Sequence, residues 1–357
     1  MEKLASVQVV REVLPVVGIS PDGKEFTADS IELVRFQDIA WQCVVRKDDA
    51  IKVGDLAIYA MIDTVVKPHA IYDFLRPRGY KIKTAKFLKT TLSQGVCFPM
   101  STLWHFDTRL VLGAFNQGDD VSEIMGVEKD EKPIPSYVGG DIFGPLPAYI
   151  PKTAETRIQS APQALEELRG HPAYVTVKMP GCSGTFYLHD GHFGVCSRKV
   201  ELKDTASNIF WQMARKFDLE GVLRREWLAS GREFALQGEI CGPGLPGPHG
   251  NLLGLKEYNV FFFNLWEIGK WEYLDWFVLW DFCDRNRLDV VPLEWQTDRF
   301  DFTLEELLKE ADGFYEGTKN RREGIVVRSL TEMKSFALGG RLSFKVVSNE
   351  FLLAGGE

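Results

Sequence analysis

The chain has 357 residues and a formal net charge of −8, with 45% hydrophobic and 26% charged residues. This balance excludes a disordered or fibrous protein, because such chains carry too few apolar residues to build a core. It also excludes a uniformly basic surface, so any nucleic-acid site must be confined to part of the molecule. Since domains usually hold about 100–200 residues, we expect two of them.

The sequence indicates neither a membrane span nor secretion. No run reaches the roughly 18 apolar residues that a membrane span requires. Lys3, Arg11 and Glu12 interrupt the stretch where a signal peptide would be continuously apolar. The six cysteines form no CxxC pair and do not cluster with the histidines, which argues against a zinc site or a disulfide framework. We therefore expect a soluble, cytoplasmic protein with no implied protein partner.

The first part of the chain is typical of a small antiparallel barrel or sandwich. Short β-type runs alternate with turn residues, which is the pattern of such folds. The runs are IELVRF at 31–36, WQCVVR at 41–46 and LAIYAMI at 56–62. Residues 131–152 are rich in proline and glycine and have no periodicity, so they are predicted to connect two domains.

The remainder, residues 153–357, mixes helical and strand patterns. One helix is predicted between Ser160 and Gly170 and another within residues 205–217. A third begins at Thr303, because Glu306 follows at the spacing of a capping box. The pattern predicts an α+β domain with a largely antiparallel sheet.

One segment reverses the acidic balance of the chain. Between residues 76 and 89 there are six cations, no acidic residue and two aromatic residues. In a strand, Lys81 and Lys83 would share one face and could contact a phosphate backbone. The alternative is an edge strand whose lysines only prevent aggregation. We favour nucleic-acid binding by Arg76, Arg78, Lys81, Lys83, Lys86 and Lys89.

Lys178 stands between two β-type runs, in YVTVKMPGCSGTFYL at 174–188. A lysine at a strand end is a suitable covalent nucleophile when burial and a nearby cation keep part of its amine neutral. Lysines near glycines are also common in ordinary hairpins, so the interpretation depends on the segments that follow in order. These are CSRK at 196–199, LQGEICGPG at 236–244, FFFNLW at 261–266, REGIVVRS at 322–329 and LSFKVVSN at 342–349.

With these motifs in this order, the chain resembles the covalent nucleotidyltransferase superfamily of polynucleotide ligases and capping enzymes. It is most similar to ATP-dependent, nick-sealing RNA ligases that carry an OB-like domain ahead of the ligase domain. GEICGPG and SFKVVSNEFLL are the most specific segments. The resemblance implies an α+β protein with an OB-like, RNA-binding β-barrel at 1–130, a connector at 131–152, and an antiparallel-sheet nucleotidyltransferase domain, of the ATP-grasp-like ligase adenylation type, at 153–357.

The resemblance also implies roles for four cations. Lys178 would attack the α-phosphate of ATP and carry the AMP, and Lys345 would neutralise that phosphate during transfer. Arg198 would bind a phosphate of the nucleotide or of the RNA end. Arg157, in the TRIQ segment, is a weaker candidate for the nucleotide site.

Carboxylates and aromatic residues complete the implied site. Glu239 would contact the ribose of ATP or a hydrated metal, and Glu323 would help to hold Mg²⁺ or Mn²⁺. Phe263 would stack on the adenine, and Phe261, two residues away on the same strand face, is the alternative. Taken singly, each of these residues could be an ordinary surface carboxylate or core aromatic residue.

The implied reaction has three steps. Lys178 takes AMP from ATP and releases pyrophosphate, AMP then passes to an RNA 5′-phosphate, and a 3′-OH finally attacks that end and expels AMP. Each step is a phosphoryl-type transfer, in which positioning and cations supply most of the acceleration.

Two positions depart from the family pattern. Pro180 stands where relatives carry a polar residue, and Ser343 stands where many carry a lysine. Because proline offers neither an N–H nor a side-chain acceptor, an RNA-end-binding protein with impaired catalysis remains an alternative. A DNA ligase or guanylyltransferase relative is another, although the chain ends soon after Lys345, where such enzymes typically continue into a further OB domain.

Overall fold

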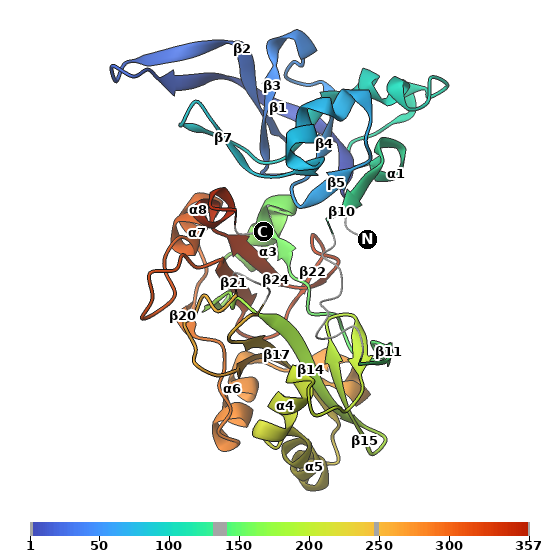
Figure 1. Cartoon of the computed structure of the whole chain (residues 1–357), viewed down its shortest axis with the longest axis vertical. Coiled ribbons are helices and arrows are strands. Elements are labelled where there is room, and N and C mark those ends of the chain that lie inside the picture. Colours follow the sequence, from blue (N-terminus) through green and yellow to red (C-terminus); the bar gives the residue numbers. More distant parts are fainter. Residues whose placement is uncertain (1–2, 131–140, 246–249, 356–357) are drawn as a thin grey trace. The chain divides into compact units, whose positions relative to one another are not determined.

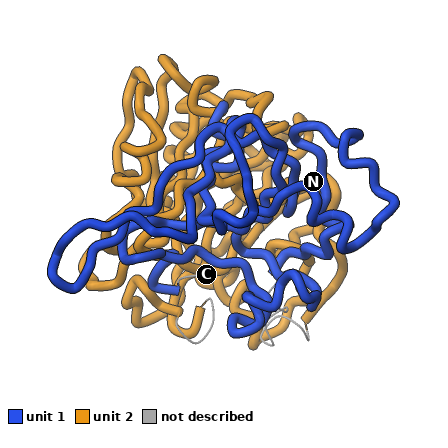
Figure 2. Tube along the Cα trace, turned by 90° about the horizontal axis from the view of Figure 1, so that it is seen from above, with its two compact units in different colours: residues 1–131, 159–163, 352–357 blue, residues 132–158, 164–351 orange. Residues whose placement is uncertain are grey.

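The computed structural model describes residues 3–130, 141–245 and 250–355, and the chain forms two compact units (Figures 1 and 2). The N-terminal unit comprises residues 1–131, 159–163 and 352–357, and the C-terminal unit comprises residues 132–158 and 164–351. Much of the predicted connector, residues 131–140, lies outside the described residues. Within the described ranges, no helix is long and apolar enough to cross a membrane.

The N-terminal unit is built on a five-stranded antiparallel sheet with the order β3-β2-β1-β4-β9. Register shifts between Val10 and Glu12 and between Pro15 and Val17 interrupt the pairing of β1 with β2, as β-bulges do. The three runs predicted as strands are confirmed as β2, β3 and β4, although β3 begins one residue later than its run and β4 ends two residues earlier than its run. The strands are β1 (Ala5–Ile19), β2 (Glu25–Phe36), β3 (Gln42–Arg46), β4 (Leu56–Ala60) and β9 (Val96–Pro99).

Smaller elements complete this unit. A three-stranded sheet has the order β10-β5-β6, and β7 pairs with β8. Their bounds are β5 (Thr64–Val66), β6 (Lys81–Ile82), β7 (Ala85–Phe87), β8 (Thr91–Ser93) and β10 (Val127–Lys129). The helical segments are η1 (Lys47–Asp49), η2 (Ala70–Arg78), η3 (Met100–His105), η4 (Leu112–Ala114) and α1 (Ser122–Met125).

The C-terminal unit contains two larger sheets. The seven-stranded sheet has the order β11-β16-β15-β14-β17-β18-β19, and the five-stranded sheet has the order β12-β24-β21-β13-β20. The first comprises β11 (Ile142–Pro145), β14 (Cys182–His189), β15 (His192–Ser197), β16 (Val200–Leu202), β17 (Phe234–Cys241), β18 (Asn259–Glu267) and β19 (Glu272–Tyr273). The second comprises β12 (Thr156–Arg157), β13 (Ala173–Val177), β20 (Leu293–Thr297), β21 (Gly324–Ser329) and β24 (Ser343–Val347).

Helices and a short hairpin accompany these sheets. The hairpin joins β22 (Lys334–Ser335) to β23 (Gly340–Arg341). The helices are η5 (Ile158–Ser160), α3 (Gln163–Leu168), α4 (Ile209–Lys216), α5 (Leu219–Ser230), η6 (Ile268–Lys270), α6 (Trp276–Arg285), α7 (Leu304–Ala311) and α8 (Asn349–Leu353). Figure 1 shows α4, α5 and α6 beside the strands of the seven-stranded sheet.

Strand alternation gives the five-stranded sheet two different faces. Val175, Val327 and Phe344 are fully buried in one hydrophobic core, against α3 and α7. Because neighbouring residues of a strand point to opposite faces, Arg328 and Lys345 belong to the other face. The apolar alternation of these strands thus buries one face and leaves the other for polar side chains.

The predicted helices are confirmed, with their ends set by local hydrogen bonds. α3 lies between Ser160 and Gly170, and α4 lies within residues 205–217. At α7, the hydroxyl of Thr303 accepts from the Glu306 N–H, and the Glu306 carboxylate accepts from the Thr303 N–H at 2.8 Å. This reciprocal pair is the capping box that the sequence predicts.

A buried arginine links the two sheets of the C-terminal unit. The guanidinium of Arg328, on β21, donates to the Ser343 hydroxyl at 2.9 Å and to the Phe263 carbonyl of β18 at 2.8 Å. It also donates to the Glu155 carboxylate at 2.9 Å. Burial by itself raises the pKa of Glu155, but Arg328 and Arg341 more than offset this, so the pKa lies below its usual range. The charged form of Glu155 is therefore favoured by folding.

We expect Thr303→Ala to lower the free energy of unfolding by about 1 kcal/mol, because α7 would lose its N-terminal cap. Thr303→Ser keeps the hydroxyl and should retain most of the stability. Urea denaturation followed by circular dichroism measures both effects. Equal stability of the alanine variant and the unmodified chain would show that the cap contributes nothing.

We expect Glu155→Gln to destabilise the chain by about 1–3 kcal/mol at neutral pH, since a buried charge-assisted hydrogen bond is lost. The pKa of Glu155 is lowered on folding, so its contribution is complete above the unfolded pKa of about 4.3 and is lost as pH falls through the folded value. Melting temperatures at decreasing pH should therefore converge for the two proteins. Glu305→Gln, at an exposed ion pair, is the control and should change little at any pH. A difference that persists in acid would contradict the assignment.

Candidate active site

The turn after β13 holds the side chain of Lys178. The strand itself is buried along its whole length, and Lys178 follows it with a side chain that is 22% exposed. The Lys178 N–H still donates to the Gly324 carbonyl of β21, at 3.0 Å. Pro180, two residues further on, has no N–H with which the pairing could continue. A Cβ at Gly181 would lie 2.2 Å from the Ile240 carbonyl oxygen, so only glycine fits there.

An ion pair joins the amine of Lys178 to the carboxylate of Glu323. Glu323 directly precedes β21, which is the antiparallel neighbour of β13. Both side chains are largely shielded from solvent, at 22% and 15% exposure. Strand pairing therefore brings together two residues that are far apart in the sequence and that were predicted to share a site.

Glu239 contributes a second carboxylate, from β17 of the seven-stranded sheet. Burial, together with the negative charge of Glu323, raises its pKa to about 7, while Lys178 and Arg198 act in the opposite direction. Lys178, Arg198 and Glu323 thus all lie within electrostatic range of Glu239. Arg198 stands in the turn between β15 and β16, where its side chain is exposed.

Lys345 and Arg157 are neighbours on the five-stranded sheet. β12 pairs with β24 in parallel, and Arg157 lies opposite Lys345 in that register. Lys345 also lies opposite Val326 on β21. Val326 is two residues after Gly324, whose carbonyl accepts a hydrogen bond from the Lys178 N–H. Arg157 is buried, and Lys345 is partly exposed. Lys345 therefore stands on the strand next to β21, which follows Glu323, and Arg157 stands one strand further away, on β12.

Phe261 and Phe263 are partly exposed on β18, whereas Phe262 between them is fully buried in the core. Phe261 lies opposite Glu239 in the antiparallel register. The Phe263 ring is 5.7 Å from the guanidinium of Arg328, which also donates to its carbonyl. The structure therefore leaves both candidate stacking residues available, as strand alternation predicts.

The carboxylates of Glu239 and Glu323 suit a hard divalent cation. Mg²⁺ and Mn²⁺ prefer oxygen ligands, and these two side chains supply carboxylate oxygens beside each other. Burial is the main cause of the raised pKa of Glu239, and a bound cation would favour its charged form. The donor set therefore fits the metal that the sequence implies.

A second group of potential ligands lies elsewhere in the C-terminal unit. His189, Asp190 and Glu233 place their ligand atoms within 4.8 Å of one another. The His189 imidazole is 2.6 Å from the Glu233 carboxylate, which also accepts from the Asp190 N–H at 2.8 Å. These contacts brace the β14–β15 hairpin, so the group is explained without a metal.

Three residues near the site were not predicted. Arg328 and Glu155 form the buried ion pair described above, and Tyr315 hydrogen-bonds the backbone of Lys178. Arg328 could have been found, because a charged residue in the apolar run GIVVRS requires a buried partner. Tyr315 lies in a loop without periodicity, and no sequence pattern points to it.

The predicted basic segment lies in the N-terminal unit on several short elements. Lys81, on β6, is half-buried and ion-pairs with Asp130 at 2.6 Å, so part of its charge is compensated. β6 ends at Ile82, so Lys83 is not on the same strand as the sequence predicts. Phe74 and Phe87 are exposed among these cations, at 57% and 37%. The exposed cations are Arg76, Arg78, Lys83, Lys86 and Lys89.

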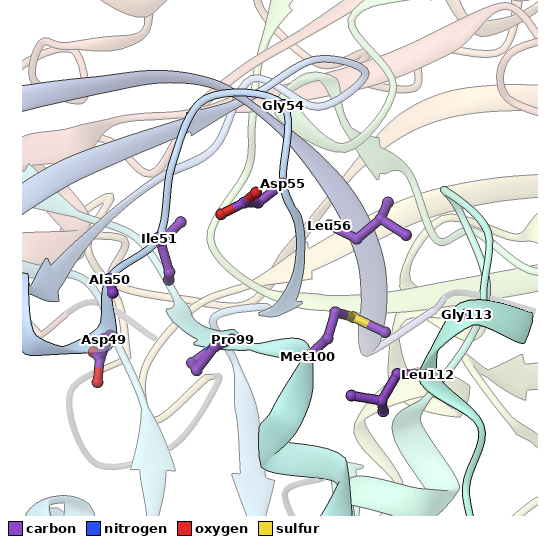
Figure 3. Close-up of a pocket in the computed structure, with 10 residues that line it drawn as sticks. All are labelled: Asp49, Ala50, Ile51, Gly54, Asp55, Leu56, Pro99, Met100, Leu112 and Gly113. Carbon is purple, nitrogen blue, oxygen red and sulfur yellow. The ribbon is translucent and has the colours of Figure 1, made fainter.

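A hollow of about 480 Å³ in the same unit is lined by acidic and apolar residues instead of cations (Figure 3). Asp49 and Asp55 line it together with apolar side chains such as Ile51 and Met100. Among the described residues, no lysine or arginine contributes to the lining. Its carboxylates would repel phosphates, so the exposed cations remain the candidate contact for a nucleic acid.

Comparison with known proteins gives matches for both parts of the chain. A family model described as RNA ligase matches residues 171–347, and a model described as an OB-fold domain matches residues 4–100. The first range contains Lys178, Glu239, Glu323 and Lys345. No curated protein matches.

Solved structures of the RNA ligase of Naegleria gruberi resemble the whole chain. The structure with pyrophosphate is 32% identical with a TM-score of 0.83, covering 100% of this chain and 99% of that one. A glutamate-to-alanine variant with ATP and Mn is 32% identical with a TM-score of 0.84, covering 100% of both chains. A lysine-to-methionine variant with AMP and Mn is 32% identical with a TM-score of 0.82, covering 98% of both chains.

These matches confirm the predicted fold, an OB-fold domain followed by a sheet-rich nucleotidyltransferase-like domain. They extend over the full chain, and the ion-paired lysine and its carboxylates lie within the matched ligase region. The chain therefore belongs to the RNA ligase family.

Proposed function

We propose that this RNA ligase uses ATP to join 3′-OH and 5′-phosphate RNA ends or nicks through AMP bound covalently to Lys178. The observation that carries the proposal is the shielded amine of Lys178, which is paired with Glu323 and lies within electrostatic range of Glu239. The Naegleria ligase structures with ATP, AMP, pyrophosphate and Mn support this choice of substrate and metal.

In the first step, Nζ of Lys178 gives up a proton, which the Glu323 carboxylate can accept, and the neutral amine forms a bond with the α-phosphorus of ATP. The bond from that phosphorus to the bridging oxygen breaks, and pyrophosphate leaves with the electron pair. Glu323 holds Nζ in place, and burial of the pair limits competition by water. Mg²⁺ or Mn²⁺, held by Glu239 and Glu323, would supply positive charge to the phosphates.

The remaining cations of the site would act on the phosphates. Lys345 and Arg157 are register neighbours on β24 and β12, so they present two positive charges along one edge of the sheet. Arg198, exposed in its turn, can reach a phosphate of ATP or of the RNA end. Positive charge fixed near the transferring phosphate lowers the barrier to transfer.

Adenine would stack on an aromatic ring of β18. Phe263 and Phe261 are both partly exposed, and an aromatic face suits the flat base. Arg328 fixes the backbone of Phe263 through its carbonyl, which favours Phe263 as the stacking residue. Phe261, opposite Glu239, remains the alternative.

We assign RNA binding to residues 1–130, a connecting role to residues 131–152 and adenylation to residues 153–357. The contacts proposed for RNA are the cations of the basic segment, with Phe74 and Phe87 exposed among them. Duplex RNA around a nick would be recognised mainly by its shape and its 2′-hydroxyls. We also propose a cytoplasmic location for this RNA ligase.

A second candidate function rests on Pro180. It is buried and offers neither an N–H nor a side-chain acceptor next to the nucleophile, so catalysis could be lost while RNA ends are still bound. The presence of Lys178, Glu239 and Glu323 in one site favours the active ligase. A guanylyltransferase relative would show itself by a preference for GTP over ATP.

We expect the chain to become covalently labelled when it is incubated with Mg²⁺ or Mn²⁺ and ATP labelled at the α-phosphate. Lys178→Ala should reduce this labelling to background, because the nucleophile is absent. Lys203→Ala, at an exposed lysine outside the proposed site, is the control and should be labelled as the unmodified chain is. No label on the unmodified chain would favour the RNA-binding alternative, and label on Lys178→Ala would exclude Lys178 as nucleophile.

We expect Lys83→Ala combined with Lys86→Ala to weaken RNA binding and to reduce its salt dependence, because each lost phosphate contact lowers the slope by about 1. Labelling by ATP should be unchanged. Lys24→Ala combined with Lys52→Ala removes two exposed cations of the same unit outside the basic segment, and should bind RNA normally. Filter binding at several salt concentrations measures both pairs, and equal losses would rule out a specific role for the basic segment.

A further inference from the structure

Tyr315 makes two hydrogen bonds that join the nucleophile to its carboxylate partner. Its hydroxyl donates to the Lys178 carbonyl at 3.0 Å and accepts from the Glu323 N–H at 3.1 Å. A phenol has one hydrogen to donate and lone pairs to accept, so both functions are in use. The side chain is only 3% exposed and belongs to the hydrophobic core of the unit.

These hydrogen bonds, with one more between the backbones, connect the two segments that carry the ion pair. The Lys178 N–H donates to the carbonyl of Gly324, the residue after Glu323, at 3.0 Å. Tyr315 connects the same two backbone segments on the carbonyl side of Lys178. With both segments fixed, the starting points of the Lys178 and Glu323 side chains are fixed as well.

The loop that carries Tyr315 is itself closed by hydrogen bonds. The Tyr315 N–H donates to the Asn320 carbonyl at 3.0 Å, and its own carbonyl accepts from the N–H and the hydroxyl of Thr318. The Arg322 N–H donates to the Gly313 carbonyl at 2.9 Å. Tyr315 is therefore presented by a braced loop, not by one that must order when substrate binds.

We propose that Tyr315 is a positioning residue for lysine adenylation, holding Nζ of Lys178 and the Glu323 carboxylate at the separation and angle that attack on ATP requires. The inference rests on the proposed role of Lys178. Tyr315 does not touch ATP in this account, because its hydroxyl is occupied by backbone groups on both sides. A displacement of about 1 Å at a reacting group costs on the order of 100-fold in rate, so a small relaxation here has a measurable effect.

Tyr315→Phe removes only the hydroxyl and keeps the ring in the core. We expect the rate of covalent labelling at saturating ATP to fall by about 10- to 100-fold, with KM for ATP changed by less than about twofold. Substrate binding should persist because the phosphate and adenine contacts are untouched. Single-turnover labelling at several ATP concentrations separates the two quantities, and thermal melting checks that the variant is folded.

Tyr72→Phe is the matched control. Tyr72 is also fully buried, and its hydroxyl donates to the Met125 carbonyl at 2.8 Å, but it lies in the N-terminal unit. It should lower the melting temperature by a similar amount and leave labelling unchanged. The proposal is overturned if Tyr315→Phe is labelled at the normal rate, or if both variants lose rate in proportion to their loss of stability. An unmodified chain that takes no label would instead remove the role of Lys178 on which the inference rests.

Discussion

The antiparallel pairing of β13 with β21 is the constraint on which the proposed active site depends. It places Lys178 at the end of one strand beside Glu323 at the start of the other, and their charges meet in a partly shielded ion pair. Because the backbone N–H of Lys178 and the hydroxyl of Tyr315 extend this pairing, the side chains that react start from fixed positions. A nucleophile held in this way needs little rearrangement before it attacks.

The seven-stranded sheet supplies a second carboxylate, that of Glu239, to the site. β17 brings Glu239 towards the ion pair, where burial, helped by the negative charge of Glu323, raises the pKa of Glu239 to about 7. Lys178 and Arg198 partly offset that cost. Buried charged groups whose pKa values are shifted by burial and by neighbouring charges are typical of functional sites. A divalent cation would compensate the negative charge of the two carboxylates, and the phosphates of ATP would compensate the positive charge of the lysine and the arginine.

Arg328 explains how one departure from the family pattern is accommodated. The resemblance implies a lysine at the position of Ser343, whose hydroxyl accepts a hydrogen bond from the guanidinium of Arg328. The same guanidinium reaches Glu155 and the backbone of β18. A small hydroxyl at 343 thus leaves room for a buried arginine that joins the two sheets.

The sequence by itself determined the family resemblance, three strands of the first unit, the α7 capping box and the order of the ligase motifs, because these depend on local patterns and short spacings. It could not determine that Lys178 pairs with Glu323, that Lys81 is compensated by Asp130, or that Tyr315 binds the backbone of the nucleophile. Those contacts join residues distant in the chain, and only the pairing of strands and the closure of loops bring them within hydrogen-bonding distance.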